Sequence, residues 1–192
     1  MRKLYVGLLH FPVYNKNNMI ITSAVTNFDI HDISRASKTF GAENYFIITP
    51  NQGQHRVVSQ IISHWQEGFG ASYNTDRKDA LGSTFLIDSI DDSIKFIEEK
   101  EGVKPLVVAT SANKDENYKH FTVQELRKTL TEEGDPIFLV FGTGYGMVLE
   151  QLPQIEYMLE PIYGCGDYNH LSVRSAVSIY LHSLKGKWEI LN

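Results

Sequence analysis

Hydrophobic residues along the chain follow two alternating patterns. Short apolar runs rich in β-branched and aromatic residues predict buried strands over residues 3–10, 44–49, 84–88, 105–110 and 136–141, with a weaker one over 157–162. Between these runs the apolar positions recur at helical spacing. Strands that alternate with helices indicate a parallel sheet covered on both faces. The predicted fold class is therefore α/β, a mostly parallel sheet flanked by helices.

The expected helices have recognisable ends. Apolar stripes at helical spacing predict helices over residues 30–40, 57–65, 90–97 and 173–184. Gly41 and Gly68 stop the first two, because glycine is the preferred residue just beyond a helix. Thr122 and Glu125 have the spacing of a capping box and open a further helix, and Ser172 is placed to cap the last one.

Two polar stretches interrupt these patterns. Residues 12–26 contain three asparagines and little periodicity, and residues 68–82 mix Gly, Ser, Asn and Asp with Arg77 and Lys78. We predict both as long loops, and loops of that length in a compact domain usually have a function or move.

Composition narrows the class of protein. With 192 residues the chain is expected to form a single domain over 1–192, and 42% hydrophobic residues exclude disorder and collagen-like repeats. The single Cys165 can form no internal disulfide, and the histidines lack metal-ligand spacing, so no metal is expected. No stretch approaches the ~20 apolar residues of a membrane helix, and the N-terminus lacks a cleavage site. We expect no membrane association and a cytoplasmic location.

The charge balance restricts binding to nucleic acid. The formal net charge is −5, from 18 Lys and Arg against 23 Asp and Glu. A protein that coats nucleic acid unspecifically is normally basic. Any RNA binding must therefore use a local patch or a shape-selective encounter.

Candidate chemistry follows the last three strands. The turns are Ser-Ala-Asn at 111–113, Gly-Thr-Gly-Tyr-Gly at 142–146, and residues 161–172, which run into the last helix. Ligands of open parallel sheets bind at the carboxyl ends of strands. Glycine lets the backbone approach a ligand closely, and a helix N-terminus adds unpaired amides. These turns predict a binding site, the alternative being plain strand-to-helix connections.

The glycine turn is not a dinucleotide or phosphate loop. Its spacing is G-x-G-x-G rather than G-x-G-x-x-G, and 46 residues follow Gly146, too few for a second mononucleotide half. No Gly-Lys-Ser/Thr sequence occurs in the chain either, which excludes a P-loop.

Taken in order, these motifs resemble those of the SPOUT, or α/β-knot, RNA methyltransferases. The matching runs are Ala-Thr-Ser-Ala at 109–112, Phe-Gly-Thr-Gly-Tyr-Gly at 141–146 and Tyr-Asn-His-Leu-Ser-Val-Arg-Ser-Ala at 168–176. In residues 26–35, Asn27 precedes a helix that carries Arg35, which is similar to the first SPOUT motif. The resemblance spans about residues 4–184 and is best to the small single-domain bacterial branch related to tRNA (guanine-N1)-methyltransferases.

The resemblance implies a fold and a function. It implies a C-terminal deep trefoil knot, S-adenosylmethionine bound in a bent conformation within the knot, and a homodimer with active sites at the subunit interface. The implied activity is methyl transfer to a nucleotide of RNA, either tRNA or rRNA. Such transfer needs an acceptor held in line, a route for its proton and exclusion of water, but no metal.

The resemblance also implies roles for individual residues. Those expected to bind the cofactor are Thr110, Ser111, Phe141, Gly142, Thr143, Gly144, Gly146, Pro161, Ile162, Gly164, Tyr168, Asn169, Leu171, Ser172 and Ser175. Those expected to bind the substrate are Asn27, Arg35, His170 and Arg174, and those expected to be catalytic are Arg35, Asn169 and Asp167. Asp167 is the candidate proton acceptor, because it is the carboxylate nearest to the third turn.

Each of these residues also has a simpler interpretation. Arg35 lies off the apolar stripe and can be merely solvated, and Asn27 can be a turn or cap residue. Capping alone can explain Ser172 and Asn169, although it does not explain His170 and Arg174 in the same turn. Asp167 can be a solvated turn residue.

Two other functions remain open from the sequence. The first is a non-enzymatic knotted module that binds a cofactor or RNA, which the charge of −5 favours. The second is a flavodoxin-like nucleotide-binding protein, which flavin absorbance of the purified protein would identify.

Overall fold

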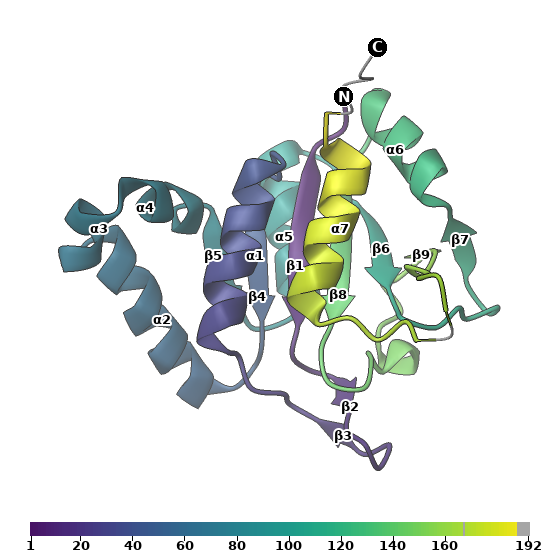
Figure 1. Cartoon of the computed structure of the whole chain (residues 1–192), viewed down its shortest axis with the longest axis horizontal. Coiled ribbons are helices and arrows are strands. Elements are labelled where there is room, and N and C mark those ends of the chain that lie inside the picture. The colour runs from purple at the N-terminus through teal and green to yellow at the C-terminus, as the bar shows by residue number, and fades with distance from the viewer. Residues whose placement is uncertain (167, 188–192) are drawn as a thin grey trace.

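The computed structural model describes residues 1–166 and 168–187. Its centre is a seven-stranded sheet in the order β5-β4-β1-β8-β6-β9-β7, in which all neighbouring strands run parallel (Figure 1). The strands are β1 Leu4–Leu9, β4 Tyr45–Ile48, β5 Thr84–Ile87, β6 Leu106–Thr110, β7 Lys119–Phe121, β8 Ile137–Gly142 and β9 Tyr157–Leu159. The prediction of a parallel α/β sheet is confirmed.

Helices cover both faces of this sheet. They are α1 Asn27–Thr39, α2 Gln52–Gln66, α3 Phe69–Tyr73, α4 Thr75–Leu81, α5 Ile90–Glu101, α6 Val123–Thr131 and α7 Val173–Lys185, with a 3₁₀ turn η1 at Leu149–Gln151. In Figure 1, α1 and α7 lie side by side across the middle of one face, and α2, α3 and α4 extend beyond the β5 edge. Helix α5 covers the opposite face.

The core is divided by the sheet, because successive side chains of a strand point to opposite faces. Leu4, Val6 and Leu8 of β1 pack with α1, α6 and α7, whereas Tyr5 and Leu9 pack with α5. All six residues of β1 are buried, as expected for a central strand with both faces covered.

The predicted helix starts are confirmed at two places. Thr122 and Glu125 form the capping box that opens α6. The Ser172 side chain accepts a hydrogen bond from the Ser175 amide and caps α7. Such caps satisfy amides that otherwise have no partner in the first turn of a helix.

The loop predicted over residues 68–82 was wrong, whereas residues 12–26 are mainly irregular, as predicted, apart from one short strand pair. Residues 68–82 fold into α3 and α4, with the Asn74 side chain capping α4. Residues 12–26 contain a small antiparallel pair, β2 Val13–Tyr14 and β3 Ile20–Ile21. Strand β7 was also not predicted. Short elements of this kind carry too few periodic positions to be recognised, and long-range pairing holds them in place.

Candidate functional site

A cavity of about 720 Å³ lies where the three C-terminal turns meet the starts of α1 and α7. We call it the loop cavity. The carboxyl ends of neighbouring strands β1, β8, β6 and β9 adjoin it, because the pairing aligns Leu9 with Gly142 and Thr110 with Leu159. The volume falls in the range of pockets for cofactor-sized ligands, roughly 300–1,000 Å³. The site therefore lies at the edge of the sheet that the sequence indicates.

The glycine turn after β8 is held by the β2–β3 hairpin. The Tyr145 amide donates to the Tyr14 carbonyl at 2.9 Å, and the Tyr14 amide donates to the Gly146 carbonyl at 2.9 Å. Gly144 has a φ of +61°, and a Cβ there would lie 2.7 Å from the Tyr14 carbonyl oxygen. Only glycine fits this position without strain.

The first and third turns are joined by one side chain. The Asn169 Nδ2 donates to the Ala112 carbonyl oxygen at 2.6 Å. The first turn is shaped in addition by the Ser111 hydroxyl, which accepts from the Asn113 amide at 3.1 Å. Asn169 therefore closes the loop cavity by bridging the turns that follow β6 and β9.

The starts of α1 and α7 meet at the same cavity. Thr26 caps α1 and Ser172 caps α7, and both residues line the loop cavity. Each helix directs unpaired amides and a partial positive charge toward its N-terminus. The cavity thus offers two backbone sites that favour an anionic group such as a carboxylate.

Asp29 links these two helix starts. Asp29 is buried, with 4% of the residue's surface exposed. Its carboxylate accepts hydrogen bonds from Arg174 Nη1 at 3.0 Å and from the Thr26 hydroxyl at 2.6 Å. The other side of the Arg174 guanidinium lies 3.5 Å from Asp32. Among the described residues, Asp29 is the one carboxylate that lines the loop cavity.

A buried histidine supports the cavity from below. The Thr143 hydroxyl donates to the Leu9 carbonyl at 3.0 Å, so the Ser23 hydroxyl must donate to Thr143 at 2.5 Å. Ser23 must then accept from His10 Nδ1 at 2.8 Å, which assigns the Nδ1–H tautomer. His10 Nε2 is buried without a hydrogen-bond partner among the described residues. Burial lowers the pKa of His10 to about 4, against an opposing effect of Asp29.

An apolar wall completes the cavity. The rings of Phe141 and Tyr180 lie 6.0 Å apart, and Ile162 and Leu171 line the same space. The Tyr180 hydroxyl donates to the Glu160 carbonyl at 2.7 Å, and burial raises the pKa of this phenol. Tyr180 is therefore a neutral part of the wall.

One residue of α2 reaches the border of the cavity. The Gln54 Oε1 accepts from the Val25 amide at 2.6 Å, and its Nε2 donates to the Ser23 carbonyl at 3.0 Å. Ser23 lines the loop cavity. Gln54 thus fastens α2 to the segment between β3 and α1.

The structure brings most of the predicted residues together. Those that line the loop cavity are Thr110, Ser111, Phe141, Gly142, Thr143, Gly144, Gly146, Ile162, Asn169, His170, Leu171, Ser172 and Arg174. Pro161, Gly164, Tyr168 and Ser175 do not line it. Asn27 and Arg35 line a different cavity, described below. Asp167 lies outside the described residues.

Sequence analysis missed several residues of the site. Ser23, Thr26 and Asp29 come from the stretch around the start of α1, and Tyr180 comes from the body of α7. Thr26 and Asp29 form a capping box. This pattern is recognisable in the sequence, although only Asn27 was named as a candidate at this helix start. Ser23 and Tyr180 carry no local signal, because only the tertiary fold brings them to the cavity.

Among residues 1–166 and 168–187, no three His, Cys, Asp or Glu side chains are grouped so as to hold a metal ion. Over the same residues, no helix has the length and apolar character needed to cross a membrane.

The sequence is similar to a known protein family over almost its whole length. The model for "SAM-dependent RNA methyltransferase" matches residues 3–186. A tRNA (guanine-N(1)-)-methyltransferase of Oleidesulfovibrio alaskensis is 38% identical over 185 residues, which cover 96% of this chain and 42% of that protein. The chain thus spans less than half the length of that relative. An uncharacterized protein of Aquifex aeolicus is 35% identical, covering 94% of this chain and 87% of its own length.

Solved structures share the fold at low sequence identity. A methylase family protein of Haemophilus influenzae has a TM-score of 0.63 at 18% identity, over 96% of this chain and 64% of the other. The SpoU methyltransferase AviRb from Streptomyces viridochromogenes, solved in complex with AdoMet, has a TM-score of 0.57 at 12% identity, over 95% of this chain and 56% of the other.

Proposed function

The chain belongs to the SAM-dependent RNA methyltransferase family, and from this premise we propose that it transfers a methyl group from S-adenosylmethionine to a nucleotide of RNA. The observation that carries the proposal is the loop cavity itself, in which three backbone-rich turns, two helix N-termini and an apolar wall converge. We take tRNA as the first substrate to test, because the Oleidesulfovibrio relative carries that name.

The residues of the loop cavity fit the proposed cofactor in chemical type. Phe141, Ile162 and Leu171 offer apolar surface to the adenine, and the turns after β6 and β8 offer backbone groups to its polar edge. The helix starts and Arg174 suit the carboxylate of its methionine part, and Asp29 suits its positive charge. When bound, the cofactor supplies an electrophilic methyl group on a sulfonium.

The acceptor must lose a proton to a group of the protein or to water. Asp29 lines the cavity, and Asp167 was proposed from its place in the third turn, so these two carboxylates are the candidates for a protein group that accepts the proton. Asn169 fixes the third turn, and Arg35 addresses the RNA. Single-turnover rates of Asp29→Asn and Asp167→Asn across pH distinguish the two, because loss of the acceptor removes the rate increase with rising pH.

A homodimer is part of the proposal. Phe28, at the start of α1, is 66% exposed. Leu171, just before α7, is 45% exposed, and Ile179, within α7, is 40% exposed. The Arg174 guanidinium lies 5.5 Å from the Phe28 ring centre, so this apolar surface adjoins the loop cavity. A second copy that covers it would exclude water from the site. Light scattering of the purified protein tests this, and a monomer at micromolar concentration contradicts it.

The C-terminal knot also remains a proposal. It rests on the family resemblance, and a crystal structure with a fully traced chain tests it.

The decisive test of the activity has two parts. Calorimetry with S-adenosylhomocysteine should show binding, and none at millimolar concentration would refute the cofactor. Labelled methyl groups should then pass from S-adenosylmethionine to tRNA or rRNA in a single turnover, and Arg35→Ala should abolish the label. Cofactor binding without transfer to either RNA would favour the non-enzymatic module, which the net charge of −5 supports.

A further inference from the structure

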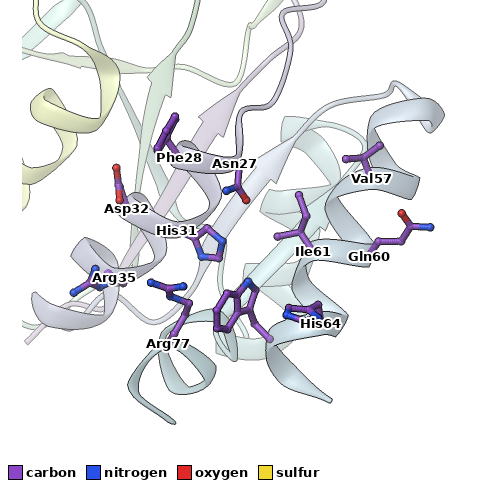
Figure 2. Close-up of a pocket in the computed structure, with 11 residues that line it drawn as sticks. Asn27, Phe28, His31, Asp32, Arg35, Val57, Gln60, Ile61, His64 and Arg77 are labelled. Carbon is purple, nitrogen blue, oxygen red and sulfur yellow. The ribbon is translucent and has the colours of Figure 1, made fainter. Parts of the chain in front are cut away.

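A second cavity lies on the other side of α1. It has a volume of about 530 Å³ and lies open to solvent between α1, α2 and the start of α4. We call it the helix cavity. Figure 2 shows its side chains, with Arg35 and His31 from α1, Gln60 and His64 from α2, and Arg77 from α4. No residue of the loop cavity lines it, so the two are distinct.

The helix cavity contains a firmly held aromatic ring. Arg77 places its guanidinium carbon 4.3 Å from the centre of the Trp65 ring. His31 and His64 meet the same ring edge-on, at centroid distances of 5.6 and 5.2 Å. A Cβ on Gly70 would lie 2.6 Å from Trp65 Cε3, so the chain passes directly against the indole. Four contacts fix Trp65 before any ligand arrives.

The cavity also gathers positive charge in an acidic protein. Arg35 and Arg77 both line it, and neither guanidinium forms an ion pair with a carboxylate among the described residues. The one lining carboxylate there, Asp32, lies 3.5 Å from Arg174 Nε and is partly neutralised by it. Unpaired arginines in a concave site attract anions.

One buried nitrogen of the helix cavity lacks a hydrogen-bond acceptor. Arg77 Nε is buried and has no hydrogen-bond acceptor among the described residues. A buried donor of this kind costs about 1–3 kcal/mol. An anionic oxygen that reaches Arg77 Nε would supply the missing partner. The positive surroundings act on His31 as well, where burial first, and then Arg77, lower the pKa.

We propose that the helix cavity binds one nucleotide of the RNA substrate, with its phosphate at Arg35 and Arg77 and its base against Trp65 and the Gln60 amide. This rests on RNA being the substrate of the loop cavity. Cationic side chains beside an aromatic surface are the combination by which proteins hold unpaired nucleotides. An inorganic anion or an acidic peptide would bind through the arginines alone. Neither ligand would use the ring of Trp65, and we therefore favour a nucleotide.

The test uses the ring itself as the reporter. The chain has two tryptophans, Trp65 and Trp188, and Trp188→Phe leaves Trp65 as the only one. Titration of this variant with a mixed-sequence RNA pentanucleotide at low salt should quench Trp65 fluorescence saturably. Arg77→Gln should weaken that binding at least about tenfold, and Arg35→Gln about fivefold. The matched control is Arg56→Gln, exposed on α2 outside the cavity, which should change the affinity less than about twofold.

Several outcomes overturn the proposal. They are no response of Trp65 to the RNA, equal weakening by Arg77→Gln and Arg56→Gln, or inorganic pyrophosphate binding as tightly as the RNA. Arg77→Lys guards against misfolding, because it keeps the charge and should retain part of the affinity. Calorimetry with S-adenosylhomocysteine on the same samples separates the two proposals. Normal cofactor binding with a silent Trp65 refutes only this inference, whereas an RNA response without cofactor binding refutes only the proposed function.

Discussion

The two cavities on either side of α1 are built from different materials. The loop cavity is formed mainly by turns, helix starts and small residues, so its shape is a property of the main chain. The helix cavity is formed by long side chains of three helices around Trp65. A main-chain site is shaped in advance for one ligand, whereas contact with an aromatic side chain tolerates different bases. The first suits a constant cofactor and the second suits a variable nucleotide.

The largest expected effect concerns pH and the support of the loop cavity. The pKa of His10 falls from its usual 6.5 to about 4 on folding. The unfolded chain therefore binds a proton below pH 6.5 while the folded chain does not. Stability should be fully present above pH 6.5 and should fall by about 3 kcal/mol as the pH drops to 4.

Denaturant unfolding at a series of pH values measures this loss. His10→Gln should remove most of the difference between pH 6.5 and pH 4, whereas His170→Gln, at an exposed position, should keep it. If the two variants lose stability equally on acidification, His10 is not the sensitive group.

The next effect tests whether the main chain shapes the loop cavity. Gly144→Val forces a side chain into a positive-φ position, against the Tyr14 carbonyl. Calorimetry should show about a hundredfold weaker binding of S-adenosylhomocysteine, since backbone strain of this kind costs about 1–3 kcal/mol. Gly166→Ala, with no atom within 4 Å of the added Cβ, is the control. The Trp65 response to RNA should survive in both, and its loss in Gly144→Val would break the separation of the cavities.

A smaller effect is expected where α1 and α7 are tied together. Asp29→Asn leaves Arg174 without its buried partner and should lower the free energy of unfolding by about 2 kcal/mol. Asp32→Asn is the matched control, because it removes the other partner of the same guanidinium from a side chain that is 52% exposed. It should cost less than about 0.5 kcal/mol. Chemical denaturation measures both free energies of unfolding. Equal losses would mean that the buried pair of Asp29 with Arg174 stabilises the fold no more than the exposed pair with Asp32.

The smallest effect concerns the bridge between two turns. Asn169→Ala removes the hydrogen bond to the Ala112 carbonyl, worth about 1 kcal/mol. Cofactor affinity should fall about fivefold, with RNA binding at Trp65 unchanged. Asn117→Ala, at an exposed position outside both cavities, should leave calorimetric affinity as it is. An unchanged affinity in Asn169→Ala would show that the turns hold their positions without it.

The difference between the cavities also explains what could be predicted from sequence. Glycines and hydroxyls after successive strands identify a main-chain site, because the order of elements already places the turns at one edge of the sheet. The α7 start was predicted for the same reason, since Ser172 and the apolar stripe behind it are adjacent in sequence. Gly144 was expected from its turn, although its closeness to Tyr14 depends on a hairpin that was not predicted.

The helix cavity has no such local signal. Trp65 was assigned to an apolar stripe, and Arg77 to a loop that turned out to be α4. Their stacking depends on how α4 folds back against α2, a tertiary contact between positions 12 residues apart. His10 was likewise passed over among scattered histidines, because its role depends on Ser23 and Thr143, which come from distant parts of the chain.

Gln54 gives the pair of cavities a mechanical connection. It sits in the first turn of the helix that carries Trp65, yet it grips the backbone at both Ser23 and Val25, on the rim of the other cavity. These two hydrogen bonds are the contact through which an RNA bound at Trp65 and a ligand of the loop cavity would sense each other, if the two proposed sites are filled together. Energetic coupling between two ligands is always mutual. If bound RNA changes the affinity of the loop cavity for its ligand, that ligand must change the affinity for RNA by the same factor, whichever of the two binds first.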